Sequence, residues 1–105
     1  MKSPKQILEN FNKYYDGIEG ILHTQVANFR TKSIIVFIDE DKFNARMSRE
    51  FEDIPIVIYN VKKMLKHSKT IIDGAKKIQI NKSDEKMIER FQRTYEICED
   101  MIKNS

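Results

Sequence analysis

The sequence has a single cysteine, Cys98, so no disulfide can form within the chain. One cysteine among 105 residues is typical of a protein from a reducing compartment. Residues 1–7 lack the apolar stretch of a secretory signal, and the longest apolar run, residues 34–38, is too short to cross a membrane. We therefore expect a soluble, cytoplasmic protein without a membrane partner.

Residue types that build catalytic and cofactor sites are also scarce. The three glycines are too scattered to form a phosphate-binding loop. His23 and His67 are the only histidines, and neither has a neighbour at the spacing of zinc ligands. We expect no cofactor, no metal and no catalytic residue. Cys98 lies within an apolar helical stripe, where we expect a buried packing residue rather than a nucleophile.

The chain begins with the pattern of an amphipathic helix. Ser3 can accept hydrogen bonds from the free N–H groups of a first helical turn, and Pro4 has no N–H group to leave unpaired there. Apolar residues then recur at helical spacing, which predicts a helix over residues 4–15.

A β-hairpin is expected next. Residues 33–38 are rich in β-branched side chains and predict a strand, which needs a partner. We expect a strand over residues 20–29 to pair with it in an antiparallel hairpin. The alternative for residues 18–30 is a helix, which Gly17 and Gly20 disfavour.

The middle of the chain predicts a helix and then a strand. Phe43, Met47 and Phe51 are spaced four residues apart, which favours a helix over residues 41–52 with acids in its first turn. Residues 54–59 form the next apolar, β-branched run, which predicts a strand.

The last third of the chain predicts two helices with a strand between them. A short amphipathic helix is expected over residues 61–72, then a strand over residues 75–80. A long amphipathic helix begins at residue 83 and runs nearly to the end. Its apolar stripe consists of Met87, Ile88, Phe91, Tyr95, Cys98 and Ile102.

These elements predict one α+β domain over residues 1–105 in the order α-β-β-α-β-α-β-α. We expect a small, mixed, mainly antiparallel four-stranded sheet with helices packed on it. The order from Gly17 to Tyr59 resembles half of a ferredoxin-like fold, in which a hairpin, a helix and a third strand share one sheet. The resemblance implies a fold and no function.

Positive charge is concentrated in one segment. Residues 61–82 hold seven lysines against one aspartate, whereas the rest of the chain has twelve basic and fifteen acidic residues. Such a stripe on a helix attracts phosphates or acidic protein surfaces, although lysine-rich helix faces also serve only for solubility. The candidate anion- or partner-binding residues are Lys62, Lys63, Lys66, His67, Lys69, Lys76 and Lys77.

An acidic cluster offers a rival interpretation. Asp39, Glu40 and Asp41 directly follow a predicted strand, where a metal-dependent hydrolase or nuclease places its carboxylates. The simpler interpretation is that Asp39 caps the next helix while the other two acids face its positive end.

We therefore expect a small non-enzymatic binding or regulatory protein whose contact surface includes the basic segment 62–82. A protein partner, bound by an inhibitor or adaptor, is slightly favoured over a nucleic acid, because aromatic stacking platforms are not evident. A homodimer that pairs its sheet edges or its C-terminal helices is a further alternative.

Overall fold

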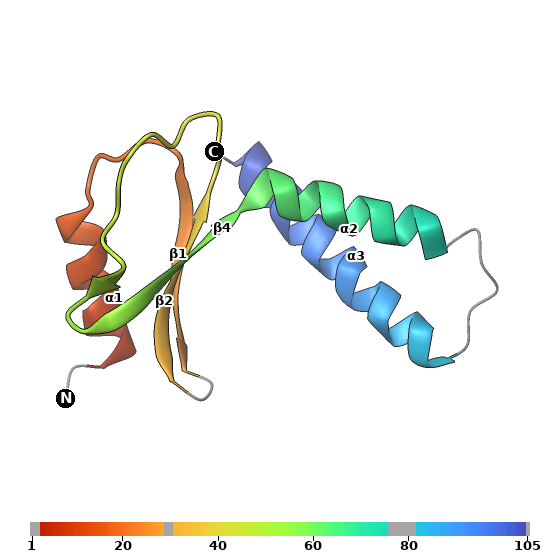
Figure 1. Cartoon of the computed structure of the whole chain (residues 1–105), viewed down its shortest axis with the longest axis horizontal. Helices are drawn as coiled ribbons and strands as arrows, with labels where there is room; N and C mark the ends of the chain where they lie inside the picture. The colour runs from red at the N-terminus through yellow and green to blue at the C-terminus, as the bar shows by residue number, and fades with distance from the viewer. Residues whose placement is uncertain (1–2, 29–30, 76–81, 105) are drawn as a thin grey trace. The chain divides into compact units, whose positions relative to one another are not determined.

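The computed structural model of the chain describes residues 3–28, 31–75 and 82–104. It divides into two compact units, Met1–Asn60 and Val61–Ser105. Among the described residues, the first unit has one helix and four strands, and the second has two helices (Figure 1). The expectation of one domain over residues 1–105 stays a prediction. The elements are α1 (Pro4–Tyr14), β1 (Ile21–Asn28), β2 (Lys32–Ile38), β3 (Glu50–Phe51), β4 (Ile54–Asn60), α2 (Val61–Ala75) and α3 (Lys82–Lys103).

The first unit is built on a mixed sheet with the strand order β1-β2-β4-β3. β1 and β2 form the expected antiparallel hairpin, so the strand interpretation of residues 20–29 is confirmed. β2 and β4 pair in parallel, and β3 adds a short antiparallel edge to β4. The α+β class and the four-stranded mixed sheet are therefore confirmed.

The core of this unit lies between α1 and the sheet. The Ser3 Oγ atom accepts a hydrogen bond from the Gln6 N–H group at 3.2 Å, which fixes the start of α1 as the sequence predicts. Side chains alternate along a strand, so one face of β2 is buried while the next residues point the other way. The buried cluster consists of Ile7 and Phe11 from α1 and of Ile34, Val36 and Ile38 from β2.

The helix predicted over residues 41–52 is wrong. The N–H groups of Lys42 and Phe43 both donate to the Asp39 carbonyl oxygen, which makes a single turn, and extended chain then leads into β3. Phe43, Met47 and Phe51 nevertheless pack against the core. Four-residue spacing thus also suits an extended segment that touches the core at intervals, and pairing with β4 outweighs a weak helical preference.

The element order is corrected accordingly. In the described residues it is α-β-β-β-β-α-α, because β3 replaces the second predicted helix. The ferredoxin-like half also fails, since residues 39–49, all of which the structure describes, connect β2 to β3 without a helix. The strand predicted over residues 75–80 lies outside the described residues apart from Ala75, which ends α2.

The second unit pairs α2 with α3. Apart from Lys62, the buried and half-buried positions on α2 recur at helical spacing, at residues 61, 64, 65, 68, 71, 72 and 75. The long amphipathic C-terminal helix is confirmed as α3, which has 22 residues. Its apolar stripe is as predicted except at Met87, which is 48% exposed. In the part of the chain that the structure describes, we find no helix with the length and apolarity that a membrane crossing requires.

Candidate functional site

The candidate lysines lie on the side of α2 that packing leaves exposed. Lys63, Lys66 and Lys69 are exposed, and Lys62 is half-buried. At about 100° per residue, Lys62, Lys66 and Lys69 fall within an arc of roughly 60°, and Lys63 lies further round the same side. We call these four residues the lysine face. Lys76 and Lys77 lie outside the described residues.

Two other charged or titratable side chains lie within or beside the lysine face. Asp73 is exposed and lies in line with Lys66 and Lys69, so the face carries one negative charge among its positive ones. The exposed His67 ring lies 6.1 Å from the Phe91 ring of α3 in an edge-on arrangement. His67 therefore marks the edge where the exposed side of α2 meets α3.

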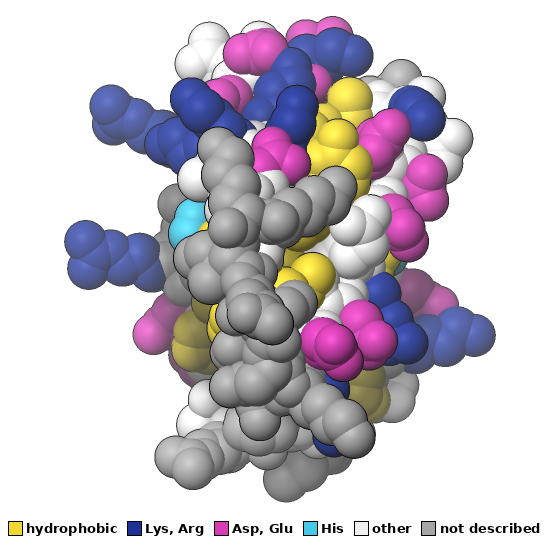
Figure 2. Space-filling model, turned by 90° about the vertical axis from the view of Figure 1, so that its right-hand side faces the viewer, with side chains coloured by type: hydrophobic (Ala, Val, Ile, Leu, Met, Phe, Trp, Pro, Cys, Tyr) yellow, Lys and Arg dark blue, Asp and Glu magenta, His cyan; other side chains and the backbone are white. Residues whose placement is uncertain are grey.

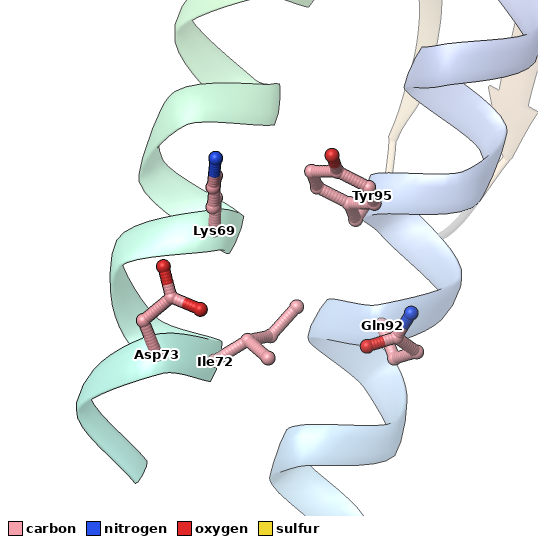
Figure 3. A pocket seen from close by; sticks show the side chains of 5 residues that line it. All are labelled: Lys69, Ile72, Asp73, Gln92 and Tyr95. Carbon is pink, nitrogen blue, oxygen red and sulfur yellow. The ribbon is translucent and has the colours of Figure 1, made fainter. Parts of the chain in front are cut away.

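A shallow cavity of about 190 Å³ opens between α2 and α3 beside the lysine face. Figure 3 shows Ile72 reaching from α2 towards α3, with Lys69 and Asp73 on the α2 side and Gln92 and Tyr95 on the α3 side. Binding sites for small organic ligands usually have about 300–1,000 Å³. This cavity is smaller and is better matched to a single side chain of a partner.

Figure 2 shows basic and acidic side chains interspersed on the side of the molecule that it presents. α2 itself carries four lysines and one acid, Asp73. An anionic partner would therefore meet a net positive charge on α2.

The acidic cluster does not form a shared site. The Asp39 carboxylate is only 3% exposed, and its Oδ1 atom accepts a hydrogen bond from the Asp41 N–H group at 3.1 Å. Glu40 instead accepts from the Asn60 side chain at 2.8 Å. Asp39 thus caps a single turn, and the expectation that it caps a helix is wrong because no helix follows. No group of three His, Cys, Asp or Glu side chains within the described residues is arranged to hold a metal ion.

Sequence reasoning missed a row of rings across the sheet. His23, Phe37 and Tyr59 occupy matching positions on β1, β2 and β4. The His23 and Phe37 ring centroids are 5.8 Å apart, and those of Phe37 and Tyr59 are 5.7 Å apart. Because strand side chains alternate, this ring row lies on the sheet face opposite Val36 and the core. The ring row can be recognised only from the register of the three strands.

Cys98 is buried, which confirms the expectation of a packing residue. Burial raises the pKa of the Cys98 thiol above its ordinary value because a thiolate is poorly solvated there. The neutral thiol is a weak nucleophile.

Comparison with known proteins finds no matching family model, no matching curated protein and no matching solved structure. Function is therefore inferred from the side chains themselves.

Proposed function

We propose that this chain is a small non-enzymatic binding protein that docks an acidic segment of another protein on the lysine face. The observation that supports the proposal is the placement of Lys66 and Lys69 with the other lysines on one exposed side of α2. A surface of this kind suits an inhibitor or an adaptor.

The spacing of the lysines favours a protein partner with an acidic helix. Lys62, Lys66 and Lys69 follow one another at intervals of four and three residues, and the seven steps from the first to the last give a rise of about 10 Å. Carboxylates at the same intervals on a partner helix match that rise. Asp73 adds a negative charge to the same line, which matches a partner of mixed charge better than a uniform polyanion.

The cavity beside the lysine face supplies an anchor point. Lys69 and Asp73 belong both to the exposed side of α2 and to the cavity wall, and the apolar Ile72 side chain also lines it. Interfaces gain most of their affinity where one side chain fills a desolvated pocket. We expect the bound segment to insert one side chain there while its carboxylates contact the lysines.

A charge-reversal experiment tests the proposal. The double variant Lys66→Glu with Lys69→Glu removes positive charge from the lysine face. The matched control, Lys5→Glu with Lys13→Glu, changes net charge by the same amount at exposed positions on α1. We would measure binding of a fluorescently labelled, glutamate-rich helical peptide and of labelled oligo(dT) by anisotropy at low and physiological salt.

We expect the wild-type protein and the α1 control to bind the acidic peptide, and the α2 variant to bind it about tenfold more weakly, a loss of about 1.4 kcal/mol. Binding should weaken as salt rises, because exposed charges are screened over about 8 Å at physiological ionic strength. An equal loss of affinity in both variants would mean that binding depends on net charge alone and not on the lysine face. Preferential binding of oligo(dT) through Lys66 and Lys69 would replace the protein partner with a nucleic acid.

A second candidate function, binding of single-stranded nucleic acid, is favoured by the ring row. Successive bases stack on aromatic side chains with about 1–3 kcal/mol per base. Tyr59 is 40% exposed and His23 is exposed, so two of the three rings can be reached from solvent. Oligo(dT) binding that is lost in Tyr59→Ala but kept in Tyr14→Ala, an exposed aromatic control on α1, would support this function. Equal binding by both variants would reject it.

A further inference from the structure

β1 forms an edge of the sheet in the first unit. It comes first in the strand order β1-β2-β4-β3, and within the described residues it pairs with β2 alone. Its eight residues, Ile21–Asn28, include no proline and no Lys, Arg, Asp or Glu. Natural proteins usually protect a long edge strand with such residues, because its unpaired N–H and C=O groups can bind a strand of another chain. The bulge of β1 precedes His23, so residues 23–28 form a regular edge.

A hydrogen bond on the far side of β4 establishes how the backbone of β1 is oriented. The Ile56 N–H group donates to the Arg49 carbonyl oxygen at 2.9 Å, next to β3 and away from β2. Backbone groups of successive strand residues point to opposite sides. Ile34, which lies beside Ile56, therefore faces β4, and Ile35 faces β1, where its partner is Gln25. The N–H and C=O groups of Gln25 thus point towards β2.

The neighbours of Gln25 have the opposite orientation. By the same alternation, the N–H and C=O groups of Thr24, Val26 and Asn28 point to the open edge. Contacts on the core side hold this strand in place, because the Thr24 hydroxyl donates to the Asn12 side chain of α1 at 2.8 Å and Val26 packs against the core. A strand that is already ordered loses little conformational entropy when a second strand pairs with it.

We propose that a second copy of the chain pairs with this edge, with the two β1 strands antiparallel and Val26 opposite Val26 of the second copy. This register sets Thr24 opposite Asn28 of the second copy. Three residue pairs then exchange about six backbone hydrogen bonds, and every outward group of Thr24, Val26 and Asn28 is used.

The edge is complementary to itself in its side chains as well. On the core side, valine meets valine and threonine meets asparagine, so that apolar and polar side chains each have a partner of their own kind. On the other face, Gln25 lies opposite Ala27 of the second copy. The strand has no Lys, Arg, Asp or Glu, so no like charges oppose each other. This match of the edge to itself favours a second copy over a strand of another sequence.

The pairing joins two sheets edge to edge about a two-fold axis. It involves β1 and is independent of the lysine face on α2. The contact is small, so we expect a dimer that dissociates on dilution rather than an obligate one.

Amide hydrogen exchange of the full chain, measured by NMR at low and high protein concentration, tests the proposal. The N–H groups of Thr24, Val26 and Asn28 should exchange about tenfold more slowly in concentrated protein, because they are bonded only in the dimer. Gln25 and Ala27 are matched controls within the same strand, since their N–H groups face β2 and should be equally protected at both concentrations. Exchange that does not depend on concentration, with a monomer in sedimentation equilibrium, would overturn the proposal.

A peptide of alternating threonine and valine tests for a different occupant. If the wild-type protein stays monomeric while this peptide protects the outward N–H groups of β1, the edge binds a foreign strand and the second copy is wrong.

Charge variants on the sheet face away from the core test the register. Gln25→Glu with Ala27→Glu places like charges opposite each other across the dimer and should weaken dimerisation about tenfold. Gln25→Lys with Ala27→Glu changes the same two positions but places opposite charges there, so it should dimerise at least as tightly as wild type. The NMR signals of β2 establish that each variant keeps the first unit folded. Equal dimerisation of the two folded variants in sedimentation equilibrium would exclude the proposed pairing.

Discussion

Gly20 gives the sharpest test of the fold, because two features of its environment exclude a side chain. Its φ angle is +88°, in the region that L-residues with a Cβ atom disfavour. A Cβ atom at this position would also lie 2.7 Å from both the Cα and the Cβ atoms of Phe43. Two hydrogen bonds prevent Phe43 from moving away easily. The Phe43 N–H group donates to the Asp39 carbonyl oxygen, and the Asp39 N–H group donates to the Gly20 carbonyl oxygen at 2.8 Å.

Gly17 separates these two effects. Its φ angle of +81° is similar, but no described atom lies within 4 Å of where its Cβ atom would be. Gly17→Ala should therefore lower the free energy of unfolding by the backbone term alone, about 1–2 kcal/mol. Gly20→Ala should lose the same amount plus about 1–3 kcal/mol for the overlap with Phe43. We expect a difference of about 1–3 kcal/mol between the two variants.

Urea unfolding followed through the NMR signals of β2 measures this difference for the first unit. Equal destabilisation by Gly17→Ala and Gly20→Ala would refute the reasoning. It would mean that Phe43 does not lie against Gly20, and the turn that begins at Asp39 would have to be abandoned in favour of the helix that the sequence predicts over residues 41–52.

Two further predictions concern buried groups. Native Cys98 should react with iodoacetamide at pH 8 far more slowly than the urea-unfolded protein does, because burial keeps its pKa high. As pH rises, the thiol of the unfolded chain loses its proton before the thiol of the folded chain does. The stabilisation from the neutral thiol should therefore be intact below pH 9.0 and decline as pH rises further. The measurement is the free energy of unfolding of wild type and of Cys98→Ala as a function of pH. Asp39→Ala should lower the free energy of unfolding by about 0.5–2 kcal/mol through loss of its bond to the Asp41 N–H group, measured by urea unfolding. Glu40→Gln should change stability little, because a glutamine side chain can keep the hydrogen bond from the Asn60 side chain. An equal loss of stability in Asp39→Ala and Glu40→Gln would contradict the role of Asp39 as the cap of the turn.

The elements that local pattern determines were predictable. The run of β-branched residues in β2, the Ser3–Pro4 start of α1 and the apolar spacing of α3 each dictate a local structure without help from the rest of the chain. The exposed side of α2 was predictable for the same reason, because its buried positions recur with the helical period and leave the lysines on the other side.

The features that depend on contacts between distant segments were not predictable. The spacing of Phe43, Met47 and Phe51 fits a helix as well as an extended chain that returns to the core, and only pairing between β3 and β4 decides between them. The ring row likewise requires the register of three strands, two of which pair in parallel across a long connection. Alternation within one strand does not reveal which residues of another strand lie beside it.

A solubilising role and a binding role make different demands on the same lysines. Solubility depends on net charge and is largely indifferent to where a charge lies. Binding depends on position, because a partner meets only the side chains within reach of its own. The comparison of Lys66→Glu and Lys69→Glu with Lys5→Glu and Lys13→Glu holds net charge constant and changes position alone. A partner that binds the two double variants with different affinity must therefore recognise the arrangement of charge on α2. We then expect its anchoring side chain to lie in the cavity between Lys69 and Tyr95.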